Sequence, residues 1–369
     1  MRTAKLKDIT LTITDGKHGD CKNHDGSGYY FISCKDVYDE TIHYENARQI
    51  TEDDFRDADR RTDLAAYDIL ITNSGTIGRM ALVKDIPETR KTTFQKSVAI
   101  VRADTSQVVP NYLYYLLKSK VHDFINSSNG SAQKNLLLST MRDFDISFVD
   151  SFETQHRIAS ILSRYDSLIE NYQKQIKLLE EAAQRLYKEW FVDLRFPGHE
   201  NTKIVDGVPE GWEKKSIGEI GTVITGKTPS TSNKENYGGS IPFITIPDMH
   251  TGIYPVSSVF LSEKGAESQS KKYIPQGALI VSCIGTAGLV CITKERCQTN
   301  QQINSLILDD KEMLHYMYFV FLSLKEHLNN IGSNGATMTN VNKSKFEGID
   351  IVVPSSCIIR DFSQRTTPQ

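Results

Sequence analysis

The chain has 369 residues, 39% of them hydrophobic and 24% charged, with a formal net charge of −3. This length fits two domains plus a connector, and no apolar run approaches the ~18 residues that a membrane-spanning helix needs. A net charge of −3 gives no overall basic surface, so binding to nucleic acid would require local patches of Lys and Arg. We expect a cytoplasmic protein, because no apolar leader follows Met1 and the six cysteines lack a paired framework.

Three sequence patterns occur twice, about 205 residues apart (334 − 129 = 205). The pairs are 13–17 with 224–227, 70–78 with 279–288, and 129–145 with 334–350. Short-period repeats indicate solenoids, whereas a repeat of this length indicates two whole domains. The sequence therefore predicts a mixed α/β chain with homologous domains at 1–150 and 201–353.

The segment from Ser131 to Phe196 contains no Gly and no Pro. Within it, apolar residues recur at alternating steps of four and three, which is the 3.5-residue period of a coiled-coil helix. About 40 residues make a rod of roughly 60 Å, whereas an ordinary core helix averages only about 11–12 residues. Pro197-Gly198 would end the rod. We expect a helical spacer at 151–200 whose apolar stripe forms a subunit interface of Ile158, Leu162, Tyr165, Ile169, Tyr172, Ile176, Leu179, Leu186 and Trp190.

Residues 221–228 match the phosphate-loop pattern GxxxxGK[ST] letter for letter. That loop needs a following helix whose N-terminus faces the phosphates. Here Pro229 follows at once, and the polar stretch 230–239 has no apolar helical period. We interpret the match as a coincidence.

Two other arrangements are weak candidates for chemistry. His18, Cys21 and His24 do not have the usual spacing of a structural zinc site. Asp206 with Glu213-Lys214-Lys215 resembles a nuclease motif, but it lies in a connector broken by Gly and Pro. Neither GxGxxG nor the Asn/Asp-Pro-Pro-Tyr/Phe motif of amino-methyl transfer occurs. The sequence therefore predicts neither a catalytic site nor a metal site.

Polar loops recur at equivalent places in both halves, at 16–24 and 91–97 in the first and at 227–234 and 297–304 in the second. Gln and Asn pair with adenine, Lys and Arg with guanine or phosphate, and Ser and Thr with either. Such residues also fill ordinary surface turns, but their duplication favours DNA reading. The DNA-binding candidates are Lys17, His18, Lys22, Asn23, Thr76, Arg79, Lys91, Gln95, Lys96, Lys134, Lys227, Thr228, Ser230, Lys271, Lys272, Thr286, Gln298, Asn300, Gln301, Gln302, Asn304 and Lys343.

At these residues the chain resembles the specificity subunit of type I restriction–modification systems. Residues 225–230 followed by 237–244 are similar to the opening of that family's target recognition domain, and residues 15–19 followed by 28–33 resemble a second variant of it. The segment 153–162 fits the start of the family's central helix, and 187–197 fits its exit. The resemblance covers almost the whole chain.

The resemblance implies two target recognition domains, each reading half of a split double-stranded DNA site, separated by a long coiled-coil-type helix. It implies a subunit with no active site and no bound cofactor. Its partners would be modification (methyltransferase) subunits and restriction subunits, which use S-adenosylmethionine, ATP and Mg.

Residues 354–369 would begin a second helical region in that family, and the sequence stops there. We interpret this as a truncation that leaves the stripe to pair with a second copy of the chain or with a modification subunit. Two other functions stay open. One is an NTPase built on Gly226-Lys227-Thr228, and the other is a coiled-coil scaffold that binds no DNA.

Overall fold

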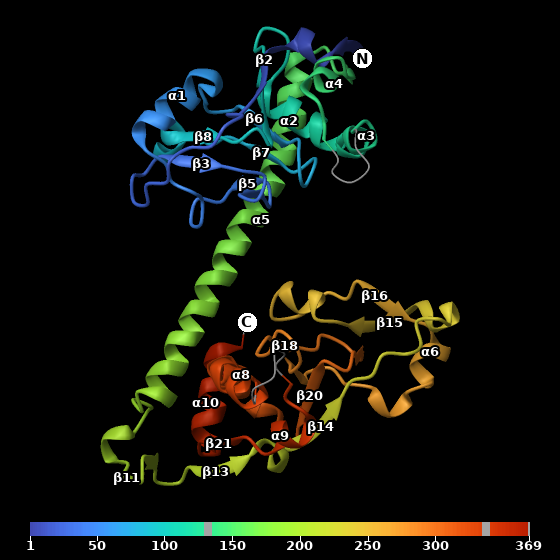
Figure 1. Ribbon diagram of the computed structural model, residues 1–369. Helices are drawn as coiled ribbons and strands as arrows, with labels where there is room; N and C mark the ends of the chain where they lie inside the picture. Colours follow the sequence, from blue (N-terminus) through green and yellow to red (C-terminus); the bar gives the residue numbers. More distant parts are fainter. Residues whose placement is uncertain (129–134, 334–339, 368–369) are drawn as a thin grey trace. The chain divides into compact units, whose positions relative to one another are not determined.

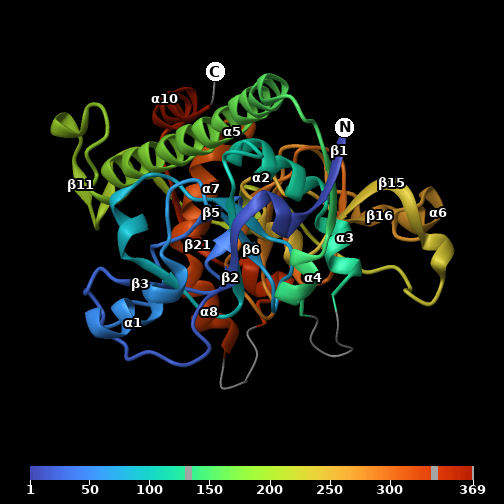
Figure 2. The ribbon, with the colours of Figure 1, turned by 90° about the horizontal axis from the view of Figure 1, so that it is seen from above.

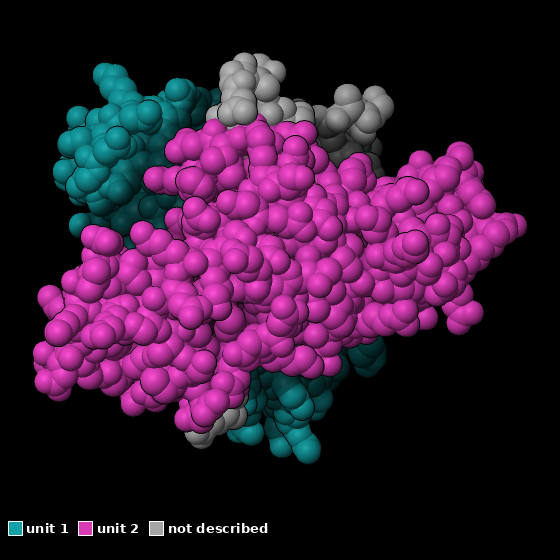
Figure 3. Space-filling model, turned by 90° about the horizontal axis from the view of Figure 1, so that it is seen from below, with its two compact units in different colours: residues 1–174 teal, residues 175–369 magenta. Residues whose placement is uncertain are grey.

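The computed structural model describes residues 1–128, 135–333 and 340–367. The chain forms two compact units, residues 1–174 and 175–369, which are coloured separately in Figure 3. The predicted α/β class with two related domains is confirmed, because each unit contains a four-stranded antiparallel sheet with the same connections. In the described ranges, no helix is both long and apolar enough to cross a membrane.

The sheet of the first unit has the strand order β2 (Thr10–Asp15), β9 (Val98–Ala103), β6 (Ile69–Thr72) and β7 (Met80–Leu82). All its neighbouring strands run antiparallel. Successive side chains of a strand point to opposite faces, so Ile69 and Ile71 pack into one core, whereas Leu70 packs into another. The sheet is therefore covered on both faces, which explains why the central strand β6 is a continuous apolar run ending in Thr72.

The sheet of the second unit repeats this order with β14 (Gly221–Thr225), β20 (Ile303–Leu308), β17 (Leu279–Ser282) and β18 (Val290–Ile292). Leu279 and Val281 pack into one core and Ile280 into another. The first two repeated patterns, 13–17 with 224–227 and 70–78 with 279–288, thus lie at the ends of equivalent strands and in the loops that follow them.

The other strands and the α-helices of each unit are connected to these sheets, and most are labelled in Figure 1. In the first unit two strand pairs are antiparallel, β1 (Arg2–Lys5) with β10 (Asp145–Phe148) and β4 (Val37–Tyr38) with β5 (Thr41–Ile42). One pair is parallel, β3 (Tyr30–Ile32) with β8 (Thr92–Phe94). The helices are α1 (Glu52–Thr62), α2 (Pro110–Ser119), α3 (Val121–Asn126) and α4 (Leu138–Arg142). In the second unit β11 (Ile204–Val205) pairs with β12 (Val208–Pro209), and β13 (Glu213–Ser216) pairs with β21 (Asp350–Val353). A further sheet has the order β16 (Val259–Leu261), β15 (Tyr237–Ile244) and β19 (Gln298–Thr299). The helices are α6 (Glu263–Glu267), α7 (Leu314–Ser323), α8 (Lys325–Ser333), α9 (Lys343–Glu347) and α10 (Ser356–Thr366).

The predicted long helix is present as α5, Phe152–Tyr187, which is unbroken in Figures 1 and 2. Its 36 residues contain neither Gly nor Pro, so every interior backbone donor can bond four residues back. A π-helical turn, Lys188–Val192, follows it. Leu194 then adopts a left-handed backbone with φ 56°, so the helix ends before Pro197.

The two ends of α5 pack into the cores of the units to which they belong. At the first end, Ile158 and Ala159 contact the first core, and buried Gln155 accepts a hydrogen bond from the Val109 amide (2.8 Å) and donates one to the Val149 carbonyl (2.7 Å). At the other end, Leu186 packs against the core of the second unit. The predicted spacer 151–200 is thus partly built into both units.

Trp190 was predicted in the exposed stripe, but its side chain is only 5% exposed. It packs against Phe191 and Phe362. The reason is that this end of the stripe packs against the second unit, because Ala183, Leu186 and Tyr187 contact the same core as Trp190. Within the segment 354–369, expected to begin a second helical region, Ser356–Thr366 form α10, whose Ile359 and Phe362 are buried in the same core.

The middle of the stripe lies on the surface. Six of its residues expose 38–64% of their area: Leu162, Tyr165, Ile169, Tyr172, Ile176 and Leu179. Exposed apolar residues are normal when scattered, but a contiguous patch marks an interaction surface.

Candidate nucleic-acid interface

Three loops meet at one end of the sheet in each unit. In the first unit, β2 ends with Asp15 opposite Ala99, and β6 ends with Thr72 opposite Val98. The loops that begin at residues 16 and 73 therefore lie beside the turn 95–97 that precedes β9. The second unit has the same arrangement, with loops beginning at residues 226 and 283 beside the turn 300–302. The patterns that recur in the sequence thus converge at equivalent positions.

The Gly-Lys pair that opens the first loop has a steric explanation. A Cβ on Gly16 would collide with the Phe94 carbonyl, and one on Gly226 would collide with the carbonyls of Thr299 and Asn300. This close approach lets the next amide bond across the loop, from Lys17 to the Phe94 carbonyl (2.7 Å). The matching bond of Lys227 goes to the Thr299 carbonyl (2.9 Å).

The geometry of residues 221–228 does not support a phosphate-binding loop. Beyond Thr228 the chain forms no helix until the short 3₁₀ segment Lys234–Asn236. A helix N-terminus pointing at a phosphate is the physical basis of that motif. Residues 221–228 instead form strand β14 and a turn.

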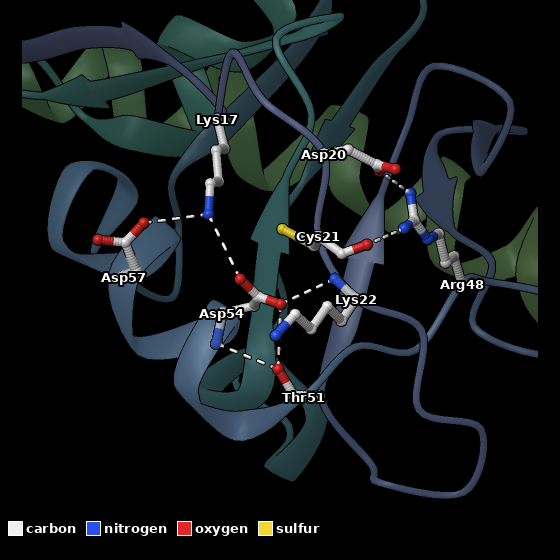
Figure 4. Close-up of polar contacts among 8 residues, drawn as sticks. All are labelled: Lys17, Asp20, Cys21, Lys22, Arg48, Thr51, Asp54 and Asp57. Atoms are coloured by element: carbon white, nitrogen blue, oxygen red, sulfur yellow. Dashed lines mark hydrogen bonds and ion pairs between the residues drawn. The ribbon is translucent and has the colours of Figure 1, made fainter.

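In the first unit, carboxylates and Arg48 hold the loop 17–24 (Figure 4). The Arg48 guanidinium donates to the side chains of Asp20 (2.6 Å) and Asn23 and to the Cys21 carbonyl. The hydrogen bond from Arg48 lowers the pKa of Asp20. On the other side of the loop, Asp54 accepts a hydrogen bond from the Lys22 amide (2.7 Å), which lowers the pKa of Asp54.

Lys17 is paired with two carboxylates of helix α1, Asp54 and Asp57. Its ammonium lies 3.0 Å from Asp57 and 3.6 Å from Asp54, and the hydrogen bond to Asp57 raises its pKa. A cation already paired with two carboxylates has less to gain from a phosphate. We therefore assign Lys17 mainly to loop structure. Among the described residues, no carboxylate lies within ion-pair distance of Lys96, Arg79 or Lys227.

His18, which follows Lys17, is oriented by the carboxylate of Asp15. Its Nε2 bonds the carboxylate of Asp15 (3.0 Å), and Arg61 donates to the other oxygen of that group (2.5 Å). Asp15 is buried, whereas His18 is exposed. The described residues contain no group of three His, Cys, Asp or Glu side chains that could hold a metal ion. The Cys21 thiol is also buried, which raises its pKa.

Most of the predicted DNA-binding residues are accessible. The exposed ones are His18, Lys22, Asn23, Thr76, Arg79, Lys91, Lys96, Lys227, Ser230, Lys271, Thr286, Gln301 and Lys343, and the half-buried ones are Lys17, Gln95, Thr228, Lys272 and Gln302. Lys134, like the Asn-Gly segments at 129–130 and 334–335, falls outside the described residues. In the first unit, the loop after β2 brings Lys17 and His18 close to Gln95. In the second, the loop after β14 brings Thr228 to Gln301.

Three predicted contacts are internal instead. Gln298 is fully buried, and its amide donates to the Ala266 carbonyl (2.9 Å). Asn304 is 2% exposed and donates to the Val341 carbonyl (3.1 Å). Asn300 is buried and bonds Gln302. Their burial follows from position, because Gln298 is in the strand β19, which pairs with β15, and Asn304 is in β20, a central strand of its sheet.

Several residues that shape the loops had no recognisable sequence signal. Asp15 and Arg61 hold His18, and Arg48 holds residues 20–23. In the second unit Tyr237 and Gln269 bond the backbone of the loop after β14. Asp15 lies three residues from His18, and the other pairs are 8–46 residues apart, without a periodic pattern that would reveal the pairing.

Comparison with known proteins identifies the family. The family described as "Type I restriction modification DNA specificity domain" matches residues 3–181 and 209–358. The HindI specificity subunit of Haemophilus influenzae is 32% identical over 335 residues, which cover 72% of each chain. The MjaIX specificity subunit of Methanocaldococcus jannaschii is 29% identical over 358 residues, covering 94% of this chain and 81% of the relative.

A solved structure agrees with the fold. The S subunit of a type I restriction–modification system from M. genitalium aligns with a TM-score of 0.61 at 15% identity, covering 99% of this chain and 88% of that one. The duplicated sheets, the long connecting helix and the sequence matches lead to the same result. The chain belongs to the family of type I restriction–modification DNA specificity subunits.

Proposed function

We propose that this chain directs a type I restriction–modification complex to a bipartite double-stranded DNA site, with one half read by each unit. The observation that carries this proposal is the duplicated set of three loops at the same end of each sheet. A split target needs two reading surfaces, and a duplicated domain supplies them. Base edges are read by side chains, whereas phosphates give affinity without sequence information.

The two loop sets differ in chemistry, which supports different half-sites. Exposed cations dominate in the first unit, with Lys96 near His18 and Arg79 on the loop after β6. In the second unit the position equivalent to Lys96 is Gln301, and Gln302 follows it. Lys and Arg favour guanine, whereas Gln favours adenine.

We infer that the chain itself is not catalytic and binds no cofactor. Methyl transfer from S-adenosylmethionine and ATP- and Mg-dependent cleavage would belong to the modification and restriction subunits. Neither the phosphate-loop match nor the Cys21 region has the geometry of a catalytic centre, which supports this division of labour.

We further infer that α5 is a protein interface. Reversing the helix about the midpoint between residues 170 and 171 places Leu162 opposite Leu179, Tyr165 opposite Ile176, and Ile169 opposite Tyr172. A second copy could therefore cover the stripe in an antiparallel, two-fold pairing, since such an interface uses the same patch twice. Helices of a modification subunit are the alternative occupant.

A domain exchange tests the DNA-reading proposal. Residues 201–353 are replaced by the equivalent domain of another specificity subunit, and methylated sites are mapped in cells carrying the modification subunit. Only one half of the bipartite site should change. A change in both halves, or in neither, would refute independent reading.

Two further measurements discriminate the other functions. ATP binding by the isolated chain would favour the NTPase. A complex with the modification subunit that gives no gel shift on any DNA would favour the scaffold.

A further inference from the structure

Side chains from other segments of the second unit fix the backbone of the loop after β14. Three side chains donate hydrogen bonds to its backbone carbonyls: Gln269 to Lys227 (2.7 Å), Tyr237 to Pro229 (2.8 Å) and Asn236 to Ser230 (3.0 Å). Gln269 and Asn236 are buried. A loop fixed at three backbone positions presents its own side chains with little loss of entropy on binding.

The facing turn is fixed as well. Asn300 donates to the side-chain oxygen of Gln302 (3.1 Å) and accepts from the Gln302 amide (3.1 Å). The Asn300 amide in turn bonds the Ile244 carbonyl (3.2 Å). Gln301 lies at the exposed corner of this turn.

One hydrogen bond joins the loop to the turn at its exposed edge. The Thr228 hydroxyl donates to Oε1 of Gln301 at 2.6 Å. The hydroxyl bonds the oxygen end of the carboxamide and so holds the Gln301 side chain against the loop. It leaves both hydrogens of Nε2 and one lone pair of Oε1 without a partner among the described residues.

A donor and an acceptor side by side match one base edge in the major groove. Adenine presents N7, an acceptor, next to the N6 amino group, a donor, whereas guanine presents the two acceptors N7 and O6. On guanine, Oε1 of Gln301 would face O6, and two acceptors would oppose each other.

From this geometry we propose that Gln301 reads an adenine in the half-site of the second unit and that Thr228 is the positioning residue that orients its carboxamide. The proposal rests on the proposed function, in that the second unit must read one half of the site. It adds the base and the two residues that select it.

The first unit provides an internal contrast. Lys96 occupies the position of Gln301, and His18, which occupies that of Thr228, bonds Asp15 instead (3.0 Å). An ammonium has donors only, so Lys96 cannot make the paired donor-and-acceptor contact proposed for Gln301.

The test maps methylation by the complex of the full chain with its modification subunit. Gln301→Glu replaces the amide by a second acceptor, which favours the amino group of cytosine. The mapped site should change from adenine to cytosine at one position of the second half-site, with the first half unchanged. Thr228→Val should reduce discrimination at that same position by about 10- to 100-fold, the range expected for one lost bidentate contact.

Two further variants separate positioning from folding. Thr228→Ser keeps the hydroxyl and should retain wild-type discrimination, and Ser232→Ala, on the same loop, should have no effect. A Gln301→Glu map identical to wild type, or equal relaxation in Thr228→Val and Thr228→Ser, would overturn the proposal while leaving the bipartite function intact. A wild-type map without a bipartite motif would instead reject the proposed function and this inference with it.

Discussion

Placing Glu at positions 169 and 176 of α5 tests whether the exposed stripe is a protein interface. Ile169 and Ile176 each expose 55% of their area. Fully burying an Ile side chain stabilises by about 1.5–3 kcal/mol, so covering the exposed part is worth about 0.8–1.7 kcal/mol per residue. A two-fold pair covers four such side chains, so the double substitution should cost about 3–7 kcal/mol, or roughly a 10²- to 10⁵-fold weaker association.

Light scattering and sedimentation over a range of concentrations measure this effect on the purified full chain. The wild type should self-associate, and Ile169→Glu/Ile176→Glu should be monomeric at the same concentrations. Glu is a better helix former than Ile at exposed positions, so the helix content from circular dichroism should not fall. Lys174→Glu is the matched control, because it changes the net charge by the same two units and lies away from the stripe on α5.

A monodisperse wild-type monomer whose mutant is unchanged in size and solubility would refute self-pairing. Adding the modification subunit then tests the other occupant. If the wild type binds that subunit and the double mutant does not, the stripe is an interface between different subunits. If both bind it equally, the stripe is not an interface of either kind.

Three other predictions concern the loops. Gly226→Ala should lower the thermal midpoint of unfolding through a loss of about 1–3 kcal/mol from overpacking, because its Cβ would strike two carbonyls. Gly19→Ala, whose Cβ would meet only the Lys17 side chain at 3.8 Å, should leave the midpoint unchanged. Asn304→Ala should cost about 1–3 kcal/mol in denaturant unfolding, since it leaves buried partners unsatisfied; a variant of wild-type stability with altered base preference would restore Asn304 as a DNA contact. Lys96→Ala should reduce the slope of log K for DNA binding against log[salt] by about 1. Lys17→Ala removes a cation already paired with two carboxylates, so it should change this slope less. Equal slopes for the two variants would contradict that distinction.

Much of the architecture follows from local pattern. The 3.5-residue apolar period and the lack of Gly and Pro specify α5, because both are properties of consecutive residues. The repeat, with its ungapped final segment, specifies two related domains whose equivalent loops lie together. These features need no knowledge of which residues meet across the fold.

The roles of individual polar residues were decided by tertiary structure. Asn304 and Gln301 belong to one run of amides in the sequence. Asn304 lies in the central strand β20 and bonds a carbonyl 37 residues away, whereas Gln301 stays exposed. Lys17 and Lys96 are both loop lysines, but only Lys17 lies against carboxylates of α1. A polar side chain becomes structural or available according to the partners that distant segments bring to it, and neither residue type nor spacing specifies those partners.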